Sequence, residues 1–188
     1  MSRAYRIRIS ESLSRHIVVD DGIQSKLEIL DILPPEQTAV LLERELEAAG
    51  FTKDECGEWV RVDDDGVEVR VDAKESTVTV RASADAKLEL ERERVVRAYA
   101  ENDAQSRERG HKALAAELEQ EAEDHRQSLQ AEVTEQLEGK LGDLRRELDQ
   151  ISNRVTSEAL KRKAASMGEV QEISEDPETG SLTIRVKI

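Results

Sequence analysis

Apolar and polar residues alternate at the start of the chain with the two-residue period that is typical of half-buried strands. The alternation is clearest over residues 5–9, and a short β-branched run follows at 16–19. Asp20-Asp21-Gly22 indicates a turn, because Asp-Gly readily supplies the positive φ of tight hairpins. A further apolar run covers 26–32. The pattern predicts a meander of three strands over 3–33.

The spacing then changes to steps of three and four, which places apolar residues on one face of a helix. The helix is predicted over 36–49, and Pro35 suits its first position, where a missing N–H costs nothing. Gly50 stands where a left-handed residue commonly ends a helix, and Phe51 stands where a capping contact is usual.

Residues 58–82 return to the two-residue period and predict three antiparallel strands. Asp65-Gly66 and residues 73–76 supply the two turns. Valines are expected on the covered face (Val60, Val62, Val67, Val69, Val71, Val78 and Val80). The opposite face should be wet, as is common in antiparallel sheets.

Residues 85–167 contain no proline and are rich in strong helix formers. Apolar residues recur there in steps of about three and four (Leu114, Leu118, Ala122, Leu129, Val133, Leu137, Leu141, Leu144, Leu148, Ile151 and Val155). Since helical propensity alone gives little stability in water, we expect this stripe to be buried against another helix.

Two arrangements would bury the stripe. A reversal at Gly139 and Gly142 brings Leu137 against Leu144 and Val133 against Leu148, so that apolar residues meet along the pair. We prefer this hairpin. A straight helix that pairs with a second copy of the chain stays open as the alternative.

Strand patterns return at 170–173 and 182–188, and we expect them to rejoin the first sheet. The predicted fold class is therefore α+β: a small antiparallel sheet body with an inserted long helical hairpin or coiled-coil arm. The predicted domains are a body of residues 1–109 with 169–188 and a helical insertion of residues 110–168.

Charge narrows the classes of partner. The net charge is −14, and the only dense basic run is Lys161-Arg162-Lys163, near a predicted helix end. Nucleic acid and anionic membrane surfaces both attract basic proteins, so we expect neither as a partner. The first residues lack the apolar core of a signal peptide, and no apolar run approaches the ~20 residues that span a bilayer. We expect a cytoplasmic protein.

Residues of the types that bind metals or act in catalysis do not cluster in the sequence. The histidines share no metal-ligand spacing with one another or with Cys56, the only cysteine. Asp63-Asp64-Asp65-Gly66 lacks the spacing of a calcium loop and suits a hairpin turn. We therefore expect no enzyme, no cofactor and no metal.

Interaction residues are the remaining candidates. The central part of the stripe is expected to hold a partner helix, from this chain or another (Leu137, Leu144, Leu148, Ile151 and Val155). Trp59 is either an exposed anchor for a partner, since aromatics are enriched at interfaces, or a residue covered by helix 36–49.

Three short motifs suggest a family. They are Leu46-Glu47-Ala48-Ala49-Gly50-Phe51, Arg97-Ala98-Tyr99-Ala100 and Gly180-Ser181-Leu182-Thr183-Ile184-Arg185-Val186. Their order is similar to that of a small domain of plastids and cyanobacteria that also occurs beside AAA+ ATPases. The whole resembles an accessory domain of bacterial ternary systems, which combine an FtsH- or MoxR-type ATPase with von Willebrand A-type partners. The resemblance covers the two ends of the chain and not residues 110–167.

The resemblance implies protein partners, with an AAA+ ATPase as the first candidate. We therefore expect a non-enzymatic adaptor or scaffold that mediates protein–protein interactions. The alternative is a self-assembling coiled-coil structural protein, in which case the chain is a homo-oligomer.

Overall fold

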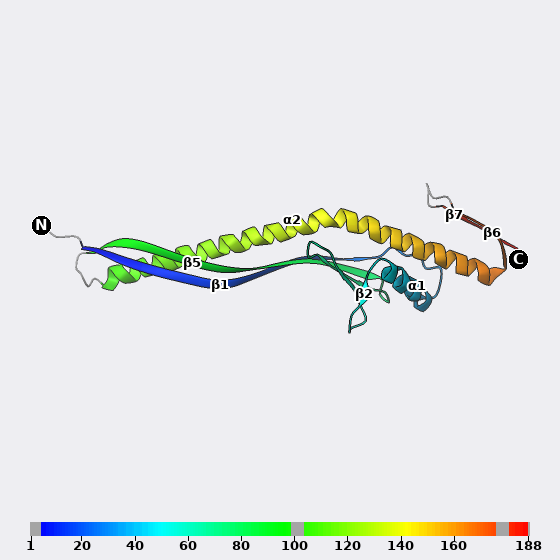
Figure 1. Cartoon of the computed structure of the whole chain (residues 1–188), viewed down its shortest axis with the longest axis horizontal. Helices are drawn as coiled ribbons and strands as arrows, with labels where there is room; N and C mark the ends of the chain where they lie inside the picture. The colour runs from blue at the N-terminus through cyan, green and yellow to red at the C-terminus, as the bar shows by residue number, and fades with distance from the viewer. Residues whose placement is uncertain (1–4, 99–103, 176–180, 188) are drawn as a thin grey trace. The chain divides into compact units, whose positions relative to one another are not determined.

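The structure, a computed structural model, describes residues 5–98, 104–175 and 181–187 (Figure 1). The predicted α+β class is confirmed: a five-stranded antiparallel sheet in the order β1-β5-β4-β3-β2 accompanies a long helix. In chain order the elements are β1 (Tyr5–Lys26), α1 (Pro35–Ala48), β2 (Thr52–Lys53), β3 (Trp59–Val62), β4 (Glu68–Asp72), β5 (Thr77–Ala98), α2 (Ala104–Met167), β6 (Glu169–Glu175) and β7 (Leu182–Lys187).

The chain forms two compact units. Unit 1 combines Met1–Asp21 with Ser83–Glu135, and unit 2 combines Gly22–Ala82 with Gln136–Ile188. The elements β1, β5 and α2 each contribute to both units. This division differs from the predicted one, because the prediction followed changes of pattern along the chain and the units follow which segments pack together.

In unit 1, β1 and β5 form a two-stranded ribbon, and α2 lies along one face of it (Figure 1). Ile7, Ile9 and Leu114 form a buried cluster, with Val96 packed against it. Gly110 allows this close approach, because a Cβ at that position would overlap the side chain of Ile9.

Arginine–glutamate pairs join the ribbon of unit 1 to α2. Their shortest N···O distances are 2.9 Å for Arg15–Glu119, 2.8 Å for Arg92–Glu121 and 2.6 Å for Arg94–Glu117. All three are exposed to solvent, so each contributes at most about 1 kcal/mol.

Two predictions for the strands of the ribbon are wrong. In place of the expected meander of three strands, residues 5–26 form the single strand β1, which continues through Gly22, and residues 27–32 form no strand. A Cβ at Gly22 would lie 2.9 Å from the carbonyl oxygen of Val80 in β5, so this glycine serves a close approach rather than a turn. Residues 85–98 belong to β5 rather than to a helix. Their alternate residues Ala86, Leu88 and Leu90 are half-buried, which is a two-residue period.

The predicted helix 36–49 is confirmed as α1 in unit 2, with Leu42 and Leu46 fully buried. Gly50 has φ +85°, and the N–H of Phe51 donates to the carbonyl oxygen of Leu46 at 3.0 Å. This is the left-handed helix end that the sequence indicated. The hairpin turn at Gly66, with φ +79°, is confirmed as well.

The predicted facing of β3 is wrong. In the β3–β4 pair, Trp59 lies opposite Val71 and Arg61 lies opposite Val69. Directly opposed residues share a face of the sheet, so Trp59 and Arg61 lie on the valine face. Val62 is on the other side and is 59% exposed. Alternation within one strand does not fix its register across a loop.

The predicted reversal at Gly139 and Gly142 is also wrong. Helix α2 is continuous over 64 residues, and a Cβ at either glycine would meet open space. The apolar stripe is largely buried as predicted, but without the second half of a hairpin: near its start, Ile7 and Ile9 of β1 pack against Leu114. A stripe shows that one face of a helix is buried and leaves open which element buries it.

At the end of the chain, β6 pairs with β7 in a separate two-stranded sheet, so the expected return to the first sheet is wrong. Tyr99 and the loop at 176–180, both used in the sequence interpretation, lie outside the described residues. Within the described part of the chain, neither helix combines the length and the apolar character needed to cross a membrane.

Candidate interaction site

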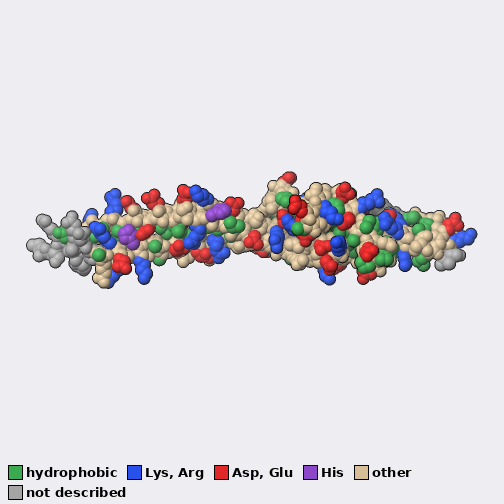
Figure 2. Space-filling view, turned by 90° about the horizontal axis from the view of Figure 1, so that it is seen from below, with side chains coloured by type: hydrophobic (Ala, Val, Ile, Leu, Met, Phe, Trp, Pro, Cys, Tyr) green, Lys and Arg blue, Asp and Glu red, His purple; other side chains and the backbone are tan. Residues whose placement is uncertain are grey.

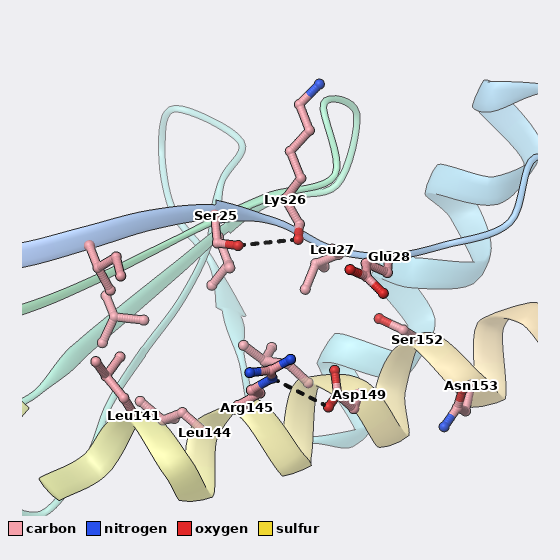
Figure 3. A pocket seen from close by; sticks show the side chains of 14 residues that line it. Ser25, Lys26, Leu27, Glu28, Leu141, Leu144, Arg145, Asp149, Ser152 and Asn153 are labelled. Atoms are coloured by element: carbon pink, nitrogen blue, oxygen red, sulfur yellow. Dashed lines mark hydrogen bonds and ion pairs between the residues drawn. The ribbon is translucent and has the colours of Figure 1, made fainter. Parts of the chain in front are cut away.

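Unit 2 contains a cavity of about 650 Å³ bounded by the end of β1, the start of β5 and α2 (Figure 3). Its apolar lining consists of Ile23, Leu27, Val78, Val80, Leu141, Leu144 and Leu148. Its polar lining consists of Ser25, Lys26, Glu28, Arg145, Asp149, Ser152 and Asn153. The volume is within the range of ligand and peptide pockets, roughly 300–1,000 Å³.

Residues spaced as in a strand and residues spaced as in a helix together line this cavity. Ile23 and Ser25 are alternate residues of β1 and line it from one face of the strand, and Leu27 follows just after the strand ends. Along α2, Leu144 and Leu148 are four residues apart and therefore share a face. Figure 3 shows both elements facing the hollow, while the side chain of Lys26 points away from it.

The polar groups at the cavity are loosely held. Asp149 and Arg145 are 4.0 Å apart and well exposed, so their ion pair is weak. Glu28 makes no ion pair with any described residue. Ser152 is only 5% exposed and is the one buried polar side chain in the described part of the chain. A partner can therefore pair with these groups without first breaking strong contacts.

The strand beside the cavity has a free edge. β1 is the terminal strand of the five-stranded sheet, so no second strand of the described ranges lies on its outer side. Such an edge can accept an additional strand, which is how many proteins recognise extended peptides. The cavity thus lies beside an edge strand of the sheet.

A single guanidinium holds the cavity-forming part of α2 in place. Arg61 donates to the two carboxylate oxygens of Glu147 at 2.6 and 2.8 Å and to the carbonyl oxygen of Ala49 at 3.2 Å. It also pairs with Asp63 at 3.1 Å and lies 4.6 Å from the ring centre of Phe51. Arg61 therefore connects β3, the end of α1 and α2 within unit 2.

These contacts shift two ionisation equilibria. The hydrogen bond from Arg61 lowers the pKa of the Glu147 carboxyl below its usual 4.5. The same bond raises the pKa of Arg61. The charged pair is thus the stable form at neutral pH.

Further polar contacts fix α2 on unit 2. Lys140 and Gln136 both contact the hairpin turn at Asp65, Lys140 at its carboxylate and Gln136 at its carbonyl oxygen. Arg154 donates to Glu45 of α1 at 2.6 Å. The wall of the cavity that α2 provides is therefore held at both ends.

All six predicted interaction residues are buried in unit 2. Leu144 and Leu148 line the cavity, whereas Leu137, Ile151 and Val155 belong to the surrounding core. Trp59 is covered rather than exposed, and its indole nitrogen is buried without a hydrogen-bond partner. The alternation of Ile23, Ser25 and Leu27 was a usable signal for the cavity, but the sequence interpretation placed a turn at Gly22 and missed it.

The described lining of the cavity contains neither histidine nor cysteine. In the ranges that the structure describes, no three His, Cys, Asp or Glu residues are placed to share a metal ion. Figure 2 shows Lys and Arg side chains interspersed with Asp and Glu on the face that it displays.

Comparison with known proteins identifies one family. Residues 1–188, the whole chain, match the family described as FtsH ternary system domain X5. Searches of curated proteins and of solved structures gave no match. The family match extends the resemblance seen at the two ends of the sequence to the central helix.

Proposed function

Because the chain belongs to the FtsH ternary system domain X5 family, we propose that it serves such a system as a non-enzymatic adaptor that binds a partner protein at the unit 2 cavity. The family description makes it an accessory component of a system built around an FtsH-type ATPase. The FtsH-type ATPase is the first partner to test.

The observation that carries this proposal is the apolar cavity beside the free edge of β1. A cavity lined by both apolar and polar side chains favours the side chains of a partner, and an edge strand favours its backbone. The proposal keeps the cytoplasmic location expected from the sequence, where ATP is available to the ATPase.

Copurification of the full chain with the ATPase of its system tests the proposal. Ile23→Glu would place a charge at the mouth of the cavity, and Val18→Glu makes a comparable change in unit 1 on the same strand. The two side chains are 46% and 63% exposed, so neither substitution disturbs the core. We expect at least a tenfold loss of affinity for Ile23→Glu and less than a twofold change for Val18→Glu. Equal binding of both variants and the unsubstituted chain would contradict the proposal.

A further inference from the structure

The β6–β7 hairpin has an apolar face that is not buried. Val170 lies opposite Val186 and Ile173 lies opposite Ile184, so these four side chains and Leu182 share one face. Val170, Leu182, Ile184 and Val186 are half-buried, and Ile173 is 48% exposed. The opposite face is polar and carries an ion pair of 2.9 Å between Arg185 and Glu172.

A hairpin of this kind requires another element of structure packed against its apolar face. An isolated two-stranded hairpin is marginally stable in water, and a third strand or a helix against its apolar face is the usual remedy. The pair β6–β7 forms a sheet of its own, so the outer edge of β7 pairs with no described strand. The hairpin thus offers an apolar face and an unpaired edge.

The cavity of unit 2 offers the complementary features. The free edge of β1 can pair with a strand, and α2 would cover the apolar face of that strand. β7 has a matching period, because Leu182, Ile184 and Val186 alternate with polar residues.

We propose that β7 of one copy adds to the free edge of β1 in a second copy and closes the cavity of that copy. Both apolar surfaces become buried in one step, and the sheet gains two strands. Within a single chain, α2 carries the hairpin about 27 Å beyond Asp149, at 1.5 Å per residue, so a second copy is the occupant that the geometry favours. The inference rests on the proposed function, because it makes the second copy a competitor of the partner at the same cavity.

Light scattering of the full chain tests the contact. We expect a mass that rises with concentration above the 21.1 kDa of one chain. Ile184→Asp in the hairpin and Ile23→Glu at the cavity should each give the single-chain mass, and Val18→Glu should behave as the unsubstituted chain does. A mixture of Ile184→Asp with Ile23→Glu should associate again, because one variant keeps an intact cavity and the other an intact β7. A single-chain mass for the unsubstituted protein at every concentration would overturn the inference.

Disulfide trapping gives a second readout that does not depend on a disruptive substitution. Cysteines at Ile23 and Ile184, in a Cys56→Ser background, should form a bond between two chains. A bond formed only within one chain would overturn the second copy as the occupant.

The affinity of the variants for the ATPase distinguishes a failure of this inference from a failure of the proposed function. If the second copy competes, Ile184→Asp should bind the ATPase at least threefold more tightly than the unsubstituted chain. Unchanged affinity of Ile184→Asp, with loss of binding by Ile23→Glu, would overturn the inference and leave the proposed function standing. Unchanged binding by Ile23→Glu would instead overturn the proposed function.

Discussion

Arg61 and Glu147 form a bidentate ion pair in unit 2, with N···O distances of 2.6 and 2.8 Å. In unit 1, Arg94 and Glu117 meet at the same two distances. The environments differ: the side chains are 19% and 36% exposed in the first pair and 43% and 52% exposed in the second. The donors differ as well, because Arg61 uses two nitrogens, one on each carboxylate oxygen, whereas Arg94 uses Nη2 alone.

We predict unequal costs for removing the two glutamates. Glu147→Ala leaves Arg61 without its main partner on the covered side and should lower the free energy of unfolding by about 1–3 kcal/mol. Glu117→Ala removes an exposed pair and should cost about 0.2–1 kcal/mol. Both residues are in α2, so the change in helix propensity is the same. Denaturation in urea measures both values, and equal costs would show that Arg61 does not hold α2 in place.

Acid should weaken the Arg61–Glu147 contact selectively. The folded-state pKa of Glu147 is lowered by Arg61, so its contribution to stability is fully present above the usual 4.5 and is lost as the pH falls through the lowered value. The stability difference between the unsubstituted chain and Glu147→Ala should be largest at neutral pH and should shrink below pH 4.5. A difference that stays constant down to strong acid would contradict the assignment of this pair.

Two glycines of α2 should respond in opposite directions to alanine. Gly139→Ala meets no neighbouring atom and should stabilise the chain by about 0.5–1 kcal/mol, because glycine is a poor helix former. Gly110→Ala would bring its Cβ against Ile9 and Val96 and should destabilise unit 1. Thermal unfolding of both variants checks the signs. Destabilisation by Gly139→Ala would indicate a break in the helix there.

The sequence was most informative where local chemistry decides the structure. Proline and glycine mark the two ends of α1, and Asp65-Gly66 marks a hairpin, because these residues favour particular φ values whatever surrounds them. The apolar stripe also predicted the helix α2, because burial of one helix face places apolar residues at a regular spacing in the sequence.

Tertiary pairing was less accessible to the sequence. The leucines of α2 fit a second helix as well as they fit a sheet, so the stripe alone did not reveal which element packs against it. The direction in which Trp59 and Arg61 face depends on their register with β4, which alternation within β3 does not contain. The cavity was missed for a related reason: it forms only because β1 continues through Gly22 and passes opposite α2.

Hydrogen exchange on the full chain, with and without the FtsH-type ATPase of its system, shows whether the partner binds at the unit 2 cavity. We predict that partner binding slows amide exchange in β1 at residues 22–26 and in α2 at residues 141–153, because an added strand pairs with the edge and excludes water from the cavity. Exchange in α1 should change little, and Ile23→Glu should abolish the protection. Protection confined to regions away from the cavity, and retained in Ile23→Glu, would contradict the assignment of this site.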